Sequence, residues 1–86
     1  MAAYKIVFTK RAQKDAAKLD AVDLRERAHA LLTTIAHNPY ELPYEKLHGD
    51  LQGLYSRRIN VKHRLVYEVH EDAKTIVVRA MWTHYE

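Results

Sequence analysis

The 86-residue chain contains no cysteine and only two glycines and two prolines. Without thiols it cannot form disulfides, a thiolate zinc site or a cysteine nucleophile, which argues against a small secreted scaffold. No apolar run approaches the roughly 20 residues that cross a bilayer, and the N-terminus lacks the apolar stretch of a signal peptide. We therefore expect a cytoplasmic protein with no membrane partner.

The composition is that of a small folded domain. Hydrophobic residues make up 48% of the chain and charged residues 29%, so neither disorder nor a fibrous repeat is indicated. A chain of this length has no room for a second hydrophobic core, and we expect one domain over residues 1–86. The net charge of +3 is modest, so the distribution of charge matters more than its total.

Positive charge is concentrated between Leu51 and Tyr67, a stretch without a single acidic residue. The basic side chains in it are Arg57, Arg58, Lys62 and Arg64, with His63 among them. Such a stretch attracts anions. The simpler interpretation is that these arginines only solvate the outer face of a sheet, because surface exposure is the usual state of arginine.

Hydrophobic periodicity predicts one strand followed by two helices in the first half of the chain. They lie at residues 4–9, at residues 10–19 with Thr9 as the helix cap, and from Asp20 or Asp23 to His37. The second helix ends there because Pro39 lacks an amide donor and forces the residue before it out of the helical region.

The second half of the chain favours strands. Residues 39–53 hold both prolines and both glycines and are interpreted as an ordered connecting loop. Residues 54–60, 63–70 and 75–82 are rich in β-branched and aromatic residues, and their short connections predict an antiparallel meander. The order β-α-α-β-β-β predicts an α+β fold in which two N-terminal helices pack on a mainly antiparallel, twisted sheet.

The first hairpin of this meander brings two arginines together. If the hairpin turns about Val61, so that Ile59 faces His63, Arg58 lies directly opposite Arg64 on one face. Like charges paired across strands destabilise a sheet unless both side chains reach water or hold an anion. Two guanidinium forks suit the oxygens of a phosphodiester. A register shift of one residue would place the two arginines on opposite faces.

Several classes of chemistry are disfavoured. The acids and histidines do not show the spacing of a metal-ligand set, no glycine-rich phosphate loop is present, and Ser56 does not lie in a G-x-S-x-G segment. Metal-free acid–base chemistry on RNA remains, because RNA supplies its own nucleophile in the 2′-hydroxyl. We expect no metal or other cofactor.

Four segments point to a known family. They are E-K-L at 45–47, D-L-Q-G-L-Y-S-R-R-I at 50–59, H-R-L-V-Y at 63–67 and T-H-Y at 83–85. In order and spacing they resemble the YoeB/Txe branch of the RelE superfamily of bacterial toxins. The resemblance covers about half of the chain, and the order of helices and strands agrees over the rest.

The resemblance implies a ribosome-dependent mRNA endoribonuclease that cuts mRNA in the ribosomal A site. It also implies a type II toxin–antitoxin system, in which an acidic, partly disordered antitoxin similar to YefM or Axe inhibits the toxin. Homodimers occur in the family. The alternatives are a ParE-like toxin that inhibits DNA gyrase by binding, without catalysis, and a plain RNA-binding module that leaves its ligand uncut.

The resemblance also implies roles for individual residues. Glu45 takes the position of the general base and His84 that of the general acid. Arg58 and Arg64 match the arginines that contact the scissile phosphate, and Tyr85 matches an aromatic residue that shapes the site.

Other basic residues are expected to contact RNA. Near the site these are Arg57, Lys46, Lys62 and His63. On the first helix Arg11, Lys14 and Lys18 would engage the backbone of ribosomal RNA, although a solvated helix face explains them equally simply. Tyr44 and Lys46 flank Glu45 where the family often has proline, which predicts a less rigid loop.

Overall fold

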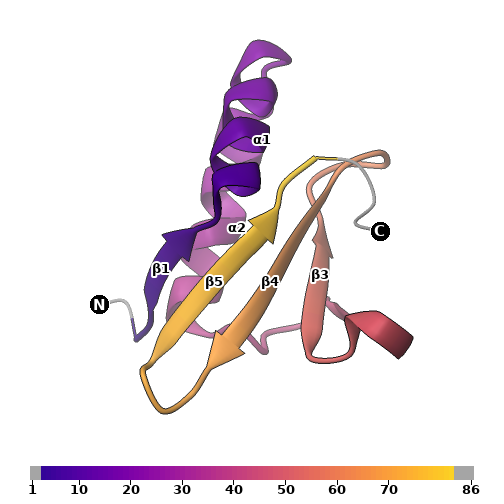
Figure 1. Cartoon of the computed structure of the whole chain (residues 1–86). Helices are drawn as coiled ribbons and strands as arrows, with labels where there is room; N and C mark the ends of the chain where they lie inside the picture. Colours follow the sequence, from indigo (N-terminus) through magenta and orange to yellow (C-terminus); the bar gives the residue numbers. More distant parts are fainter. Residues whose placement is uncertain (1–2, 83–86) are drawn as a thin grey trace.

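The computed structural model describes residues 3–82 and shows two helices packed on one face of a five-stranded sheet (Figure 1). In chain order the elements are β1 (Lys5–Phe8), α1 (Lys10–Ala21), α2 (Arg25–His37), β2 (Glu45–Lys46), η1 (Gly49–Leu51), β3 (Leu54–Arg58), β4 (Arg64–His70) and β5 (Thr75–Ala80). The sheet has the order β1-β5-β4-β3-β2. Among the described strands only β1 and β5 pair in parallel, so the predicted α+β fold with a mainly antiparallel sheet is confirmed.

The first helix begins where it was predicted. Thr9 Oγ1 accepts a hydrogen bond from the Ala12 amide at 3.1 Å and donates one to the Arg79 carbonyl at 3.2 Å. The cap therefore ties α1 to the end of β5 as well as satisfying a free amide of its first turn. Neither helix among residues 3–82 has the length and the apolar character of a membrane-spanning segment.

The predicted start of the second helix was wrong. Neither Asp20 nor Asp23 begins α2, which starts at Arg25. Asp23 has a φ of 62°, and the amide of Leu24 donates to the Leu19 carbonyl at 2.9 Å. These residues close the C-terminus of α1 with a left-handed turn, a conformation that aspartate adopts more readily than most residues.

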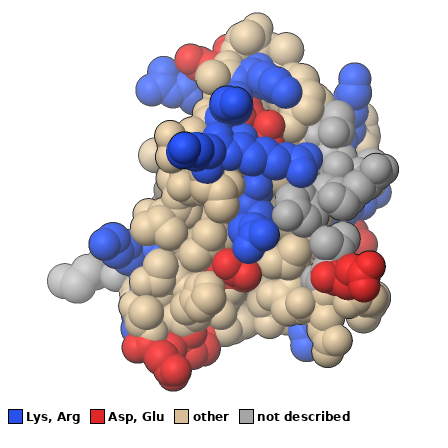
Figure 2. All heavy atoms as spheres, in the orientation of Figure 1, with Lys and Arg blue, Asp and Glu red and all other residues tan. Residues whose placement is uncertain are grey.

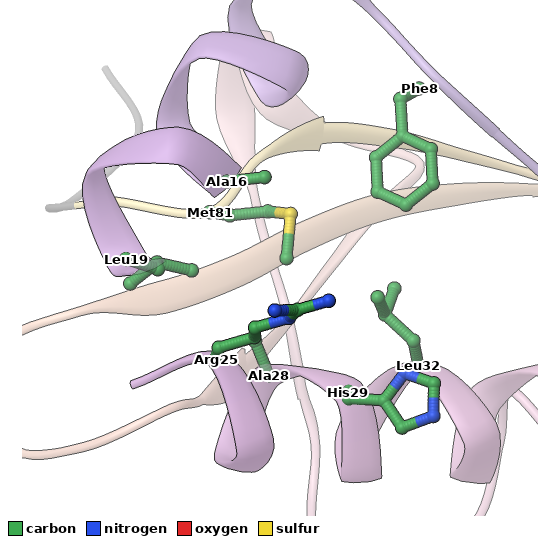
Figure 3. Close-up of a pocket in the computed structure, with 8 residues that line it drawn as sticks. All are labelled: Phe8, Ala16, Leu19, Arg25, Ala28, His29, Leu32 and Met81. Atoms are coloured by element: carbon green, nitrogen blue, oxygen red, sulfur yellow. The ribbon is translucent and has the colours of Figure 1, made fainter. Parts of the chain in front are cut away.

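The core lies between the helices and the inner face of the sheet. Its fully buried side chains include Leu19, Ile35, Leu65, Tyr67 and Ile76. Small residues on α1 leave a hollow of about 180 Å³ between the two helices, with apolar side chains pointing into it from α1, α2, Phe8 and Met81 (Figure 3). The buried face of α1 is narrow and consists of Ala12, Asp15 and Leu19.

The segment 39–53 contains more structure than a loop. Glu45 pairs with Ser56 and Lys46 with Tyr55, so a two-residue strand lies along β3, and a short 3₁₀ turn follows it. Such a strand is too short to show an alternating pattern in the sequence. Its pairing fixes where Glu45 stands relative to β3.

Candidate active site

The register of the first hairpin is confirmed. Arg58 pairs with Arg64, and the amide of Ile59 donates to the His63 carbonyl at 2.9 Å. Pairing places Ser56, Arg58 and Arg64 on the outer face, away from the helices, because Tyr55 and Tyr67 face the core. The two arginines therefore share one face of the sheet.

Glu45 lies on the same face and contacts one of these arginines. Arg64 Nη1 donates to Glu45 Oε1 at 2.9 Å and to Ser56 Oγ at 3.2 Å. The Arg64 side chain is 16% exposed and that of Glu45 63%. A pair this open to water contributes at most about 1 kcal/mol to stability, so its interest is its location rather than its energy.

The like-charge conflict between the arginines is thus resolved in two ways. Arg64 is held by the Glu45 carboxylate, whereas Arg58 is exposed to solvent. A hollow of about 180 Å³ lies beside them. It is lined by Pro43, Tyr44, Glu45, Ser56, Arg57 and Arg58. Glu45, Ser56 and Arg58, from β2 and β3, therefore line one hollow, and Arg64 contacts two of these residues from β4.

Ser56 was considered in the sequence only as a nucleophile and was missed as a contact of Arg64. The alternation of side chains along the predicted strand could have indicated this contact. Ser56 and Arg58 are two residues apart on one strand and must share a face. Ser56 pairs with Val66 and is buried, and its hydroxyl accepts the hydrogen bond from Arg64.

Arg57 is not available to RNA, which corrects the expectation from the sequence. Its side chain points to the inner face and is 3% exposed. Nε donates to the Tyr67 hydroxyl at 3.2 Å, and the two Nη atoms donate to the carbonyls of Pro39, Glu41 and Pro43. The Arg57 guanidinium therefore makes its hydrogen bonds inside the protein and not with a ligand at the surface.

His63 is also buried, so its predicted contact with RNA was wrong. It is 5% exposed, and its ring stacks on Trp82 with centroids 3.9 Å apart and planes at 22°. Nδ1 has no hydrogen-bond partner within residues 3–82. Burial, together with the positive charge of Lys62, lowers the pKa of His63, because both disfavour the imidazolium.

We predict that His63 makes the protein less stable below neutral pH. The folded-state pKa lies below the unfolded value of 6.5, so the contribution of the neutral ring is complete above that pH and is lost as the pH falls. His63→Phe keeps the ring against Trp82 but cannot titrate. Denaturant unfolding at about pH 7.5 and about pH 5.5 should show a smaller loss of stability in this variant than in the original protein. Equal losses would contradict the prediction.

The other basic residues lie at the surface. Lys46 and Lys62 are exposed, but pairing places Lys46 on the face opposite Glu45. On α1, the exposed residues Arg11, Lys14 and Lys18 lie at the end of the molecule where β5 ends. Figure 2 shows many Lys and Arg side chains in this upper half, whereas one group of acidic side chains lies at the lower end, near the β4–β5 turn.

Two predicted site residues, His84 and Tyr85, lie outside the described residues. The last described residue before them is Trp82, whose carbonyl accepts a hydrogen bond from the Arg64 amide at 2.8 Å. Within residues 3–82, no three histidine, aspartate or glutamate side chains are grouped so that they could hold a metal ion.

Comparison with known proteins identifies the family. The family model for the YoeB-like toxin of bacterial type II toxin–antitoxin systems matches residues 8–85. The chain belongs to this family. A YoeB toxin of Streptomyces coelicolor is 41% identical over 63 residues, which cover 70% of this chain and 71% of the relative. The resemblance drawn from the four sequence segments is therefore confirmed.

Solved structures of YoeB toxins have the same fold. The YoeB/ParE toxin from Agrobacterium tumefaciens is 29% identical with a TM-score of 0.86, covering 94% of this chain and 99% of that one. The YoeB dimer from Staphylococcus aureus is 34% identical with a TM-score of 0.82, covering 98% and 100%. YoeB from Staphylococcus aureus has also been solved in complex with YefM, at 32% identity and a TM-score of 0.80 over the same shares of the two chains.

Proposed function

We propose that this YoeB-family toxin is a ribosome-dependent endoribonuclease that cleaves mRNA in the A site by acid–base catalysis without a metal ion. The observation that carries the proposal is the contact between the Glu45 carboxylate and Arg64, on the face that also presents Arg58. A base beside fixed cations is what cleavage through the 2′-hydroxyl of RNA needs.

In this mechanism Glu45 accepts the proton of the 2′-hydroxyl as that oxygen attacks the adjacent phosphorus. The new P–O2′ bond forms while the P–O5′ bond breaks. His84 donates a proton to the departing 5′-oxygen. The products are a 2′,3′-cyclic phosphate and a free 5′-hydroxyl, and no water is consumed. Tyr85 shapes the site beside His84.

Arg58 and Arg64 stabilise the charge that accumulates on the phosphate oxygens in the transition state. Both hydrogen bonds of Arg64 to Glu45 and Ser56 use Nη1. A guanidinium has five N–H donors, so Arg64 can hold the carboxylate and a phosphate oxygen at once. Arg58 is exposed and reaches the same phosphate from the neighbouring strand.

The partners follow from charge and from the family. Lys62 and the basic residues of α1 bind the phosphate backbone of ribosomal RNA, and this contact should weaken as salt rises. The Staphylococcus aureus relative assembles with YefM and has also been solved as a dimer. We infer that an acidic, partly disordered antitoxin of the YefM type inhibits this toxin too. We also infer that the toxin forms homodimers.

The proposal is tested in reconstituted translation with purified protein. Mapping of mRNA 5′ ends should show cuts at A-site codons only when ribosomes are present. The matched control is the same message with a 2′-deoxynucleotide at the cleavage position, which should stay intact because it lacks the nucleophile.

Three results would contradict the proposal. Cleavage of the deoxy-substituted message would exclude attack by the 2′-hydroxyl. Intact mRNA together with inhibition of gyrase supercoiling would instead identify a ParE-like inhibitor. Binding to RNA that remains uncut, with a strong dependence on salt, would identify a plain RNA-binding module.

A further inference from the structure

The loop before Glu45 is organised around one buried cation. The Arg57 guanidinium donates from Nη1 to the Pro43 carbonyl at 3.1 Å, and from Nη2 to the Pro39 carbonyl at 3.4 Å and to the Glu41 carbonyl. Three carbonyls of a five-residue segment therefore converge on one side chain. Within residues 3–82 no carboxylate pairs with this guanidinium, so these bonds are what offsets its burial.

A tyrosine hydroxyl completes the network. Tyr67 accepts the bond from Arg57 Nε and donates to the Pro39 carbonyl at 2.6 Å. Burial raises the pKa of Tyr67, which keeps the hydroxyl protonated as the donor. Arg57 and Tyr67 thus act together, from neighbouring strands β3 and β4, on the start of the loop.

The end of the loop leads directly to the site. Pro43 is two residues before Glu45, and the ring centroid of the intervening residue, Tyr44, lies 5.8 Å from the Arg57 guanidinium carbon. Tyr44 also packs edge-on against Tyr55, with ring centroids 5.5 Å apart. These contacts set the direction in which the chain enters β2. The pairing of β2 with β3 then brings the Glu45 carboxylate within hydrogen-bond distance of Arg64.

We propose that Arg57 is a positioning residue: by binding the carbonyls of Pro39, Glu41 and Pro43 from inside, it fixes the backbone of Glu45 against the sheet. Its relevance to catalysis rests on the proposed function. The role also explains how a loop with Tyr44 and Lys46, where proline is common in the family, is kept in place. Lysine cannot replace this arginine, because an ammonium group has no planar fork to span three carbonyls and a hydroxyl.

The first test is kinetic. Arg57→Lys should lower kcat for mRNA cleavage about 10- to 100-fold while KM for ribosomes stays within about twofold, since a displaced base slows chemistry without removing an RNA contact. In a Glu45→Gln background the same substitution should have almost no further effect, because there is no longer a base to position. Arg27→Lys, a change of the same type at an exposed position on α2, is the control and should behave as the original protein.

The second test does not depend on activity. Hydrogen exchange of the Leu47 amide, which donates to the Leu54 carbonyl at 3.0 Å just after β2, should become about tenfold faster in Arg57→Lys. Amides between β4 and β5 should change little. Tyr67→Phe, which keeps the ring and removes the hydroxyl, should show the same pattern more weakly.

The outcomes are distinguishable. Unchanged exchange at Leu47 in Arg57→Lys would overturn the positioning role, whatever the enzyme does. An equal fall of kcat in the Glu45→Gln background would also overturn it, because the effect would then not pass through Glu45. If the original protein cuts no mRNA, the proposed function fails, and exchange alone decides whether Arg57 holds the loop.

Discussion

Replacing Glu45 by glutamine should slow mRNA cleavage on ribosomes by about 10²- to 10⁴-fold, the range expected when a general base is lost. Glutamine has nearly the same shape and can still accept a hydrogen bond from Arg64, but it cannot take up a proton from the 2′-hydroxyl. Single-turnover cleavage of a ribosome-bound message measures the effect on chemistry directly. The binding of ribosomes should change little.

A matched control for this prediction is Glu41→Gln. Glu41 is an exposed glutamate four residues earlier in the same loop, and only its backbone carbonyl contacts Arg57. The control should cleave at the normal rate. His84→Ala tests the partner acid and should show a loss similar to that of Glu45→Gln. Normal cleavage by Glu45→Gln would remove Glu45 from the mechanism.

Replacing Ile35 by alanine should have the largest effect on stability. Ile35 is fully buried on α2 and packs in the core beneath the sheet. Removing its outer carbons leaves a cavity, which costs about 2–5 kcal/mol, a large part of the 5–15 kcal/mol that holds a typical domain folded. Denaturant unfolding should show a lower midpoint with an unchanged slope.

A graded series supports the interpretation. Ile35→Val removes a single carbon and should cost about 0.5–1.5 kcal/mol. Val61→Ala also shortens a β-branched side chain, but Val61 is 90% exposed in the β3–β4 turn, and its effect should stay within about 0.5 kcal/mol. If Ile35→Ala and Val61→Ala had the same free energy of unfolding, the burial of Ile35 would not contribute to stability.

The sequence predicted those features that depend on neighbouring residues. Thr9 caps the start of α1, and Pro39 terminates α2. The short turn about Val61 sets the register that pairs Arg58 with Arg64. Each of these signals acts over a few residues, through a cap, a missing amide or a turn length. The contact of Glu45 with Arg64 spans 19 residues and depends on a two-residue strand, so only the family resemblance pointed to it.

The errors at Arg57 and His63 have a different cause. Both residues were assigned to RNA because of their charge, but the face that each side chain occupies decides its partners. Arg57 is two residues from Tyr55 and two from Ile59, both of which pack into the core, so alternation along β3 already placed it on the inner face. Arginine and histidine are usually found at the surface, but the position of a residue in the strand pairing determines which face of the sheet its side chain occupies.

The parallel pairing of β1 with β5 links the first strand of the chain to the last. During synthesis β1 is made about 70 residues before β5, the neighbour with which it pairs, and β5 also separates β1 from β4 in the sheet. A nascent chain that stops before Thr75 lacks the strand that joins the two parts of the sheet. A truncated translation product that lacks β5 should therefore be unable to complete the sheet, so that the toxin folds only after residues 75–80 have been synthesised.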